Sequence, residues 1–411
     1  MELTTGAVAA GGGCVARAED GRVVFVRHAL PGERVVAEVT SETTSYLRAD
    51  AVEVLAPSPQ RVVPPCPHAG PGRCGGCDWQ HAALPYQREL KASLVAEQLR
   101  RLAGDDRTVV VEPVPGDLGG LGWRTRVRFA VDRGGRVGLH AHRSHRIERL
   151  EHCLIATPAV DGVGVTAHRW SGAGEVEVLT GNAGGPPVVS VHTGRRRLGD
   201  RPSLDAGRVV NGRTEREPHR LRSEVLGHRY EVSAGVFWQV HPGAPEVLAT
   251  TVLDGLRPQP GERVADLYAG AGLFTVLLAD RVGAAGGVVA VERSGRACAD
   301  ATRNLAGRDQ VTVVRGDVTA ELVATGLGSP DVVVLDPARE GVARGVMAAL
   351  AGLRPAPRRL AYVSCDPASF ARDLRVLTDA GWSMSSLRAF DLFPMTEHVE
   401  LVAMIDPPSA T

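Results

Sequence analysis

The feature that most constrains the fold is a stretch, beginning near Gly261, in which short apolar runs alternate strictly with helical stretches. Strand-like runs occupy residues 263–268, 287–292, 311–317, 331–336 and 359–364. Strands that alternate with helices in this way are typical of βαβ units, which build a parallel sheet covered by helices on both faces. The sequence therefore predicts a doubly wound, Rossmann-like α/β domain, which we place at residues 226–411.

Two further units are predicted before this domain, and the length of 411 residues suits two to three domains. Residues 1–57 contain short strand-like runs separated by glycine and turn residues, which favours a small β-barrel. A proline-rich linker follows, and residues 58–225 are expected to form a central α+β domain with one clear helix at 86–102. The Gly- and Arg-rich stretch 193–222 gives no clear pattern.

The last two strands set the position of one carboxylate. Strand-like runs at 384–391 and 399–405 are joined by only seven residues, 392–398. A parallel crossover needs about a dozen residues or more, so the last strand is expected to run antiparallel. Glu400, at its start, then lies at the edge where the parallel strands end, near Cys365. Taken alone, such a carboxylate is more often an ordinary residue of an edge strand.

A glycine-rich turn follows the first strand of the alternating region. The run DLYAGAG, residues 266–272, ends a strand and opens a helix, and its glycines let a ligand approach the backbone. Thr275 stands where a dinucleotide fingerprint has its third glycine, so the match to NAD binding is poor. Glu292, Asp317 and Asp336 end the next three strands at the same edge. These acids could simply cap helices, but in register they suit the free ribose of S-adenosylmethionine.

A cysteine ends the fifth strand at this same edge. A lone cysteine after a strand is usually a small buried hydrophobe. Cys365, however, precedes a helix that is expected to begin near Pro367, and a helix N-terminus can stabilise a thiolate. Addition of a thiolate to carbon 6 of uracil turns carbon 5 into a nucleophile that can attack a methyl sulfonium. The pattern therefore makes Cys365 a candidate nucleophile.

Four cysteines of the central segment are unevenly spaced. They are Cys66, Cys74, Cys77 and Cys153. In a reducing cytoplasm disulfides are not expected, and four thiolates can hold either a 4Fe–4S cluster or a tetrahedral zinc ion. The spacing favours a metal centre but does not choose between the two.

The partners are constrained less strongly. The sequence has no run of about 18 apolar residues and no secretory signal, so we expect a cytoplasmic protein without membrane contact. The formal net charge of +0 counts mildly against a nucleic-acid partner, but it leaves room for a local arginine-rich surface. The candidate group is Arg124, Arg126, Arg128, Arg143 and Arg146, although such groups are usually ordinary solvated faces.

Over nearly its whole length the chain resembles bacterial RNA uridine-5-methyltransferases, which act on 23S ribosomal RNA or on the T-loop of tRNA. Residues 11–35 are similar to a TRAM domain, an RNA-binding barrel of OB type. The run CGGCDWQH at 74–81 resembles the family's iron–sulfur motif. The runs FWQVH at 237–241, SCDP at 364–367 and HVE at 398–400 match the signatures of the cofactor site, the nucleophile and the base.

The resemblance implies a role for each of these positions. A class I methyltransferase domain would bind S-adenosylmethionine through Gln239, Tyr268, Glu292, Asp317 and Asp336. Cys365 is the implied nucleophile and Glu400 the implied base. The implied ligands of a 4Fe–4S cluster are Cys66, Cys74, Cys77 and Cys153.

The resemblance thus implies an S-adenosylmethionine-dependent RNA methyltransferase that forms 5-methyluridine and acts as a monomer. The TRAM-like barrel favours 23S ribosomal RNA over tRNA as the substrate. Three alternatives remain open at this point: a tRNA T-loop enzyme, a non-catalytic RNA-binding protein with a degenerate methyltransferase domain, and a DNA cytosine methyltransferase. The last is expected to have a Pro-Cys nucleophile loop, whereas Cys365 follows Ser364, and a TRAM-like barrel would be out of place in it.

Overall fold

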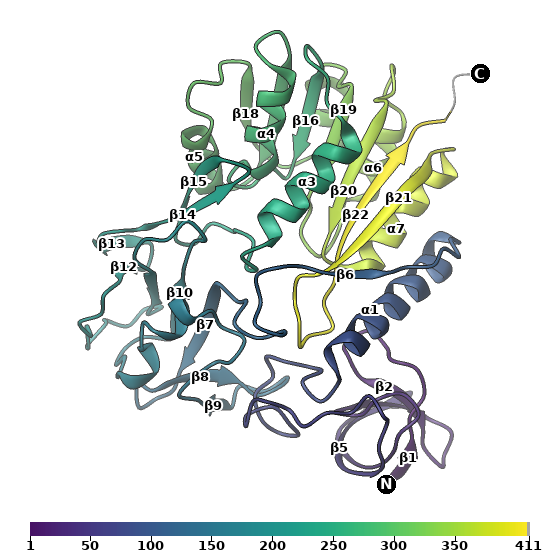
Figure 1. The fold of residues 1–411 in the computed structure, drawn as a ribbon, viewed down its shortest axis with the longest axis vertical. Helices are drawn as coiled ribbons and strands as arrows, with labels where there is room; N and C mark the ends of the chain where they lie inside the picture. Colours follow the sequence, from purple (N-terminus) through teal and green to yellow (C-terminus); the bar gives the residue numbers. More distant parts are fainter. Residues whose placement is uncertain (409–411) are drawn as a thin grey trace.

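Three sheet-containing units follow one another along the chain (Figure 1). The computed structural model describes residues 1–408. In the view of Figure 1 the C-terminal unit occupies the top, and the N-terminal and central units lie below it. Within the described residues, no helix is both long enough and apolar enough to cross a membrane.

The N-terminal unit is a five-stranded sheet in the order β1-β4-β5-β3-β2. Its strands are β1 (Glu2–Thr4), β2 (Cys14–Arg17), β3 (Val23–Arg27), β4 (Arg34–Glu42) and β5 (Tyr46–Ala56). The β4–β5 pair contains three register shifts, and the two edge strands β1 and β2 contact each other. The sheet therefore curls around a small apolar core, which includes Val24, Val26 and Val35. This confirms the small β-barrel that the sequence predicts.

The central unit is a seven-stranded sheet in the order β13-β12-β11-β10-β7-β8-β9. Its strands are β7 (Arg126–Val131), β8 (Val137–His140), β9 (Ile147–Arg149), β10 (Glu175–Leu179), β11 (Val188–His192), β12 (Gly207–Val210) and β13 (Arg213–Arg216). A short helix, α2 (Pro158–Asp161), and a 3₁₀ turn, η2 (Val165–Ala167), lie between β9 and β10. The hairpin of β14 (Arg220–Val225) and β15 (His228–Ser233) follows. The unreadable stretch 193–222 thus supplies β12, β13 and the start of β14.

The C-terminal unit is an eight-stranded sheet in the order β18-β17-β16-β19-β20-β22-β21-β6. Its parallel strands are β16 (Arg263–Leu267), β17 (Gly287–Glu292), β18 (Val311–Arg315), β19 (Val332–Leu335) and β20 (Arg359–Ser364). The last two strands are β21 (Ser383–Asp391) and β22 (Glu400–Asp406), and β22 runs antiparallel to both β20 and β21. The five predicted strands and the antiparallel last strand are therefore confirmed.

Helices cover both faces of this sheet, as its apolar strands require. One face packs against α3 (Ala244–Leu256), α4 (Leu273–Val282) and α5 (Gly295–Asn304). The other packs against α6 (Arg344–Ala351), α7 (Pro367–Asp379) and the π-helical turn η3 (Leu322–Gly326). All four residues of β19 are buried between the two layers. The Rossmann-like α/β fold is confirmed.

A segment from early in the chain completes the C-terminal unit. Helix α1 (Leu84–Gln98) continues into the π-helical turn η1 (Leu99–Ala103), which confirms the helix predicted at 86–102. Val95 and Leu99 belong to the same buried cluster as Leu374 of α7. Strand β6 (Val111–Pro113) then pairs with β21 at the sheet edge. Figure 1 shows α1 beside this edge, so it stands between the barrel and the sheet.

Candidate active site

The register between β20 and β22 brings the predicted nucleophile and the predicted base close together. Ser364, the last residue of β20, pairs with Leu401 of β22. The next position along each strand is Cys365 on one and Glu400 on the other, so the two residues follow directly from the same ladder. Cys365 is partly buried and Glu400 is 3% exposed. The antiparallel arrangement inferred from a seven-residue connection thus produces this juxtaposition.

Burial and nearby acids raise the pKa of both groups. Burial, with a contribution from Glu400, raises the pKa of the Cys365 thiol to about 12. Burial and the charge of Asp336 raise the pKa of Glu400 well above its ordinary value. Helix α7 begins at Pro367 as expected, but burial outweighs any stabilisation that its N-terminus gives the thiolate. Asp366 caps that helix by accepting a hydrogen bond from the Ser369 N–H at 2.7 Å, and its carboxylate adds to the rise.

One cation faces the pair and was not assigned a role from the sequence. The charge of Arg339 lowers the pKa of both Cys365 and Glu400. Its Nη2 lies 3.2 Å from Nε2 of His398, and burial together with this arginine lowers the pKa of His398 to about 4. Arg339 is itself exposed, so it is accessible to an anionic partner. Its place after the fourth strand, beside Asp336, was the available signal.

The predicted cofactor residues surround the glycine turn between β16 and α4. Tyr268 and Gly270 both have positive φ, +67° and +57°, which bends the chain sharply over the strand end. Glu292, at the end of β17, accepts a hydrogen bond from the Gly270 N–H at 3.1 Å and one from the Ser294 N–H at 2.6 Å. The carboxylate is therefore fixed beside the turn, in the position where α/β folds hold a ribose.

Two of the acids at this edge have unusual surroundings. Asp266 lies within β16 and is fully buried; Oδ2 accepts from the Thr275 hydroxyl at 2.5 Å, whereas Oδ1 has no partner within residues 1–408. Burial raises the pKa of Asp266 to about 7, and burial with the charge of Asp266 raises that of Asp336 to about 7 as well. Asp317 is exposed, with Arg293 at 3.7 Å. A buried acceptor without a donor fits a ligand that brings N–H or O–H groups.

The segment that carries Gln239 is linked to the glycine turn by contacts of the residues on either side of it. It is 8% exposed, and the Val240 carbonyl beside it accepts from the backbone N–H and the hydroxyl of Thr125, at 2.8 and 2.9 Å. Trp238 packs on Tyr230, whose hydroxyl donates to the Leu273 carbonyl at the start of α4. The central sheet and the glycine turn therefore hold the Gln239 segment together.

The four cysteines of the central segment face a shared volume. Burial raises the pKa of Cys74 to about 11, with added repulsion from Cys153 and Cys66. Burial, Cys153 and Cys74 raise the pKa of Cys77, and burial also raises that of Cys153. The Gly76 N–H donates to Sγ of Cys74 at 3.4 Å, and the Gln80 side chain donates to Sγ of Cys77 at 3.2 Å.

These residues fit a soft metal centre by donor type. Four thiols without a bound charge partner, with N–H groups directed at two of the sulfurs, are the surroundings that thiolate-bound iron or zinc uses. Across residues 1–408, no three His, Cys, Asp or Glu side chains stand at the spacing of metal ligands. The four sulfurs therefore lie near one another, but not at the separations of bound ligands.

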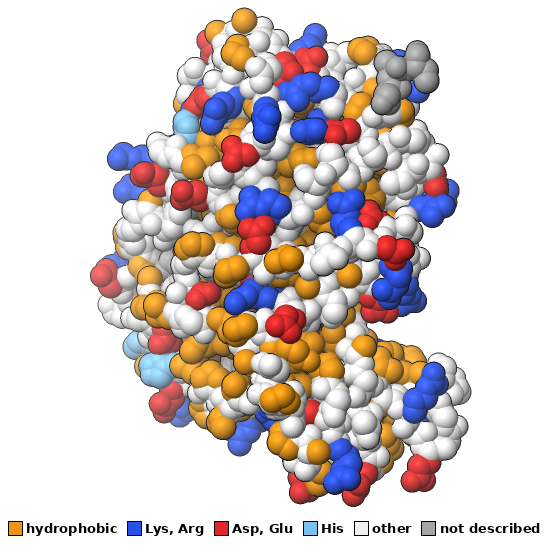
Figure 2. Space-filling view, turned by 45° about the vertical axis from the view of Figure 1, so that its right-hand side comes forward, with side chains coloured by type: hydrophobic (Ala, Val, Ile, Leu, Met, Phe, Trp, Pro, Cys, Tyr) orange, Lys and Arg blue, Asp and Glu red, His pale blue; other side chains and the backbone are white. Residues whose placement is uncertain are grey.

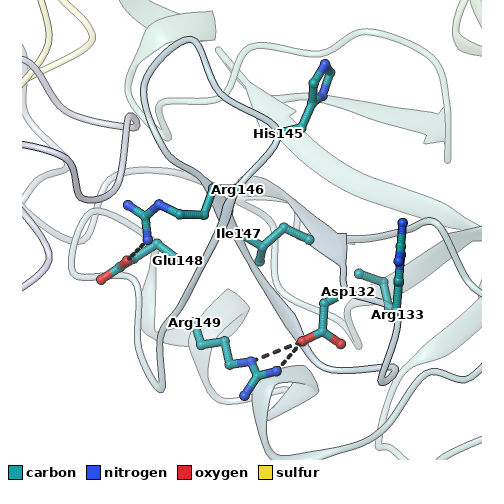
Figure 3. A pocket seen from close by; sticks show the side chains of 8 residues that line it. Asp132, Arg133, His145, Arg146, Ile147, Glu148 and Arg149 are labelled. Atoms are coloured by element: carbon teal, nitrogen blue, oxygen red, sulfur yellow. Dashed lines mark hydrogen bonds and ion pairs between the residues drawn. The ribbon is translucent and has the colours of Figure 1, made fainter. Parts of the chain in front are cut away.

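Of the five arginines singled out for RNA, Arg126, Arg128 and Arg146 already form ion pairs. Arg126 and Arg128 both bond to Glu177, with the Arg126 Nε at 2.8 Å from Oε1, so their charges are already compensated. An open groove of about 720 Å³ lies next to them along β7 and β9 (Figure 3). There Arg149 bonds Asp132 and Arg146 bonds Glu148.

Two further basic side chains of this groove have no ion pair within residues 1–408. Arg133 and His145 point away from the two ion pairs in Figure 3. Figure 2 shows basic and acidic side chains interspersed on its face of the molecule.

Comparisons with known proteins agree with this architecture. A family model described as the TRAM domain matches residues 5–52. A second model, described as protein-L-isoaspartate(D-aspartate) O-methyltransferase, matches residues 227–323. The first coincides with the N-terminal barrel, and the second covers the glycine turn and its neighbouring strands.

The similar proteins extend over nearly the whole chain. An uncharacterized RNA methyltransferase of Streptomyces coelicolor is 47% identical, over 99% of this chain and 92% of the relative. The 23S rRNA (uracil(1939)-C(5))-methyltransferase RlmD of a Shewanella species is 32% identical, over 94% of this chain and 91% of the relative. The crystal structure of the Pyrococcus abyssi tRNA (uracil-54, C5)-methyltransferase with S-adenosyl-L-homocysteine has a TM-score of 0.73 at 22% identity. It covers 98% of this chain and 100% of that one, and shows a shared fold.

Relatives at this identity span almost the full length, and a TRAM domain precedes a class I methyltransferase domain. The chain therefore belongs to the RNA uracil-C5 methyltransferase family and is an S-adenosylmethionine-dependent enzyme of that family.

Proposed function

We propose that this enzyme forms 5-methyluridine in 23S ribosomal RNA, with Cys365 as the covalent nucleophile and Glu400 as the base. The observation that carries the proposal is the β20–β22 register, which puts the thiol and the carboxyl group at adjacent ladder positions. A pair fixed by two central strands is held within the tolerance that covalent catalysis needs.

The two side chains would act in sequence. The Cys365 thiol gives its proton to solvent, and the thiolate sulfur forms a bond to carbon 6 of the uracil, which leaves the ring as an enolate with a nucleophilic carbon 5. S-adenosylmethionine, when bound, supplies the methyl group that carbon 5 accepts. Glu400 then removes the hydrogen from carbon 5, and the bond between carbon 6 and sulfur breaks to release the product. The raised pKa of Glu400 suits a group that must hold a proton at the end of this sequence.

The cofactor would lie over the glycine turn. Glu292 accepts the ribose hydroxyls, Tyr268 and Gln239 flank the cofactor, and Asp317 and Asp336 line the strand ends on either side. The fixed Glu292 carboxylate and the unpartnered buried oxygen of Asp266 support this arrangement. The domains that carry these functions are the proposed segments 1–57, 58–225 and 226–411.

We assign the four-cysteine set to a 4Fe–4S cluster. Its ligands would be Cys66, Cys74, Cys77 and Cys153. The absence of any histidine from the set supports iron–sulfur over the mixed sites common for zinc. The cluster would serve structure or RNA placement, because its ligands lie outside the methyltransferase sheet.

Ribosomal RNA is preferred over tRNA for two reasons. The barrel matches the TRAM model, and a relative named for 23S rRNA is 32% identical across most of both chains. The tRNA-named structure is only 22% identical. The proposed setting is the cytoplasm, where the chain acts as a monomer.

Mass-spectrometric mapping of 5-methyluridine in RNA from a deletion strain tests this assignment. We expect one 23S rRNA position to lose its methyl group and regain it when the gene is restored. Loss confined to the tRNA T-loop would replace the substrate with tRNA, and unchanged 5-methyluridine in both RNAs would refute the proposed activity.

A further inference from the structure

The loop that carries the base is held from outside its own sheet. Residues 392–399 join β21 to β22 and end directly at Glu400. Gln87 and Lys91 lie one turn apart on α1, and both are 0% exposed. Lys91 is the only lysine of the chain. Neither side chain takes part in the chemistry proposed above, so their complete burial requires another explanation.

Lys91 binds the start of the loop. Its Nζ donates to Oδ1 of Asp391 at 2.5 Å and to the carbonyl oxygen of Phe393 at 3.0 Å. The same carbonyl accepts from the Thr396 hydroxyl at 2.8 Å, which joins α1 to the turn of the loop itself. Asp391 is 2% exposed, and Arg88 lies 3.9 Å from its other oxygen. Apolar residues often stabilise a fold as well as a buried ion pair does, so this pair is better explained by the geometry that it fixes.

Gln87 binds the middle of the loop. Its Oε1 accepts from the Met395 N–H at 2.8 Å, and its Nε2 donates to the carbonyls of Trp79 and Ala82 at 3.0 and 2.9 Å. The Met395 carbonyl in turn accepts from the N–H groups of Asp78 and Trp79. Met395 has a φ of +68°, a conformation that costs free energy for a residue other than glycine. Bonds on both sides of its peptide groups hold it there.

We infer that Lys91 and Gln87 are positioning residues for the catalytic base, acting through the 392–399 loop. The inference rests on the proposed role of Glu400. Because Glu400 is the first residue of β22, a shift of the loop moves it relative to Cys365 and to the bound uracil. A base must lie within hydrogen-bond reach of the hydrogen that it removes, and a misplacement of about 1 Å can slow a reaction about 100-fold.

The effect is therefore selective for the last chemical step. Loss of the Lys91 and Gln87 side chains should leave β20 and the glycine turn in place, because the hydrogen bonds of these side chains go to residues 79–82 and 391–395. Addition of sulfur and transfer of the methyl group should continue. Release of the product should slow, and enzyme should accumulate as a methylated covalent complex with RNA.

The test uses the full-length enzyme with the paired substitution Lys91→Met and Asp391→Asn, which avoids a lone buried charge. Gln87→Leu provides a second variant. Glu89→Gln, at an exposed position of the same helix, is the matched control, and Glu400→Gln is the reference for a blocked last step. Turnover, affinity for S-adenosylmethionine, melting temperature and the fraction of methylated covalent complex are measured, the last by denaturing electrophoresis with methyl-labelled cofactor.

We expect the paired variant and Gln87→Leu to turn over about 10- to 100-fold more slowly, with unchanged cofactor affinity and an accumulated complex. Glu89→Gln should behave as the unmodified enzyme. Slower turnover without accumulation would mean a merely structural role and would overturn the inference, as would normal turnover. If Glu400→Gln itself fails to accumulate the complex, the proposed base role fails and the inference fails with it. Accumulation in Glu400→Gln alone refutes only the positioning role.

Discussion

Two regions of this enzyme hold partly buried cysteines, and they are built in different ways. At the catalytic edge, Cys365 follows a strand and faces Glu400 across a β-ladder. In the cysteine group, Cys74 and Cys77 lie in a loop, where they face other thiols. Burial raises the pKa of Cys365 to about 12 and that of Cys74 to about 11, so both regions disfavour a bare thiolate.

The two regions differ in the groups that could stabilise a thiolate. Cys365 has a carboxyl partner and an exposed arginine nearby, which suits a thiol that loses its proton only during reaction. In the cysteine group, other thiols lie near each sulfur and N–H groups donate to Cys74 and Cys77, which would suit thiolates that a metal neutralises permanently. A strand ladder thus fixes the positions of the proposed catalytic pair, whereas loops carry Cys74 and Cys77 of the proposed ligand set.

The largest expected effect is the loss of the nucleophile. Cys365→Ala should lower turnover about 10⁴- to 10⁶-fold, because no other group at the edge can form the bond to carbon 6. Steady-state methyl transfer to RNA measures it. Cys298→Ala, in α5, is the control and should retain nearly full activity. Substantial methylation by the Cys365→Ala enzyme would show that Cys365 is not the nucleophile, and the proposed difference between a reactive thiol and a set of ligand thiols would fail.

The second effect is the response of the Cys365 thiol to pH. A thiol is neutral below its pKa, so with a pKa of about 12 its thiolate fraction rises about tenfold per pH unit through the neutral range. Alkylation of Cys365 by iodoacetamide in RNA-free enzyme should therefore rise about 100-fold from about pH 7 to pH 9. Peptide mass spectrometry reports the rate at this residue. A plateau near neutral pH would show that the thiolate is already formed.

The third effect tests the cysteine group. Anaerobically purified enzyme should contain about four irons per chain, and Cys77→Ser should lose most of this iron. Its melting temperature should fall, whereas its affinity for S-adenosylmethionine should hold, because the glycine turn belongs to a different sheet. Elemental analysis and calorimetry measure both. Stoichiometric zinc without iron would contradict the cluster assignment.

The smallest expected effect concerns RNA contacts. Arg133 has no ion pair within the described residues and lines the groove of Figure 3. Arg133→Ala should weaken RNA binding about 3- to 10-fold and reduce the salt dependence of binding by about one counterion. Arg375→Ala, a paired arginine on α7, serves as the control. An unchanged salt dependence would exclude the groove from the RNA-binding surface.

Much of the catalytic edge could be predicted from the sequence, because strand order and chain direction follow from local patterns. The short connection before β22 predicts the direction of that strand, and its direction places Glu400 beside Cys365. Side-chain surroundings were harder to predict. Burial of Cys365, followed by the charges of nearby acids, raises its pKa beside the N-terminus of α7, and spacing in the sequence does not reveal this burial.

The long-range contacts could not be predicted from periodicity. Lys91 and Asp391 are 300 positions apart in the chain, and no local rule joins them. A single lysine on the apolar face of a helix, in a chain whose other basic residues are arginine, was the available signal. Similarly, the place of β6 at the sheet edge depends on tertiary packing, because three residues carry too little pattern.

The most direct test of the central claim is the fate of the Glu400→Gln enzyme. With RNA and methyl-labelled cofactor, it should still form the bond from Cys365 to carbon 6 and still accept the methyl group. It should then stall, because no base removes the hydrogen from carbon 5, and turnover should fall about 10²- to 10⁴-fold. Denaturing electrophoresis should show labelled complexes that contain both protein and RNA. No labelled complex should form when the same enzyme also carries the Cys365→Ala substitution. Near-normal turnover of Glu400→Gln, without a trapped complex, would contradict the assignment of this carboxylate as the base.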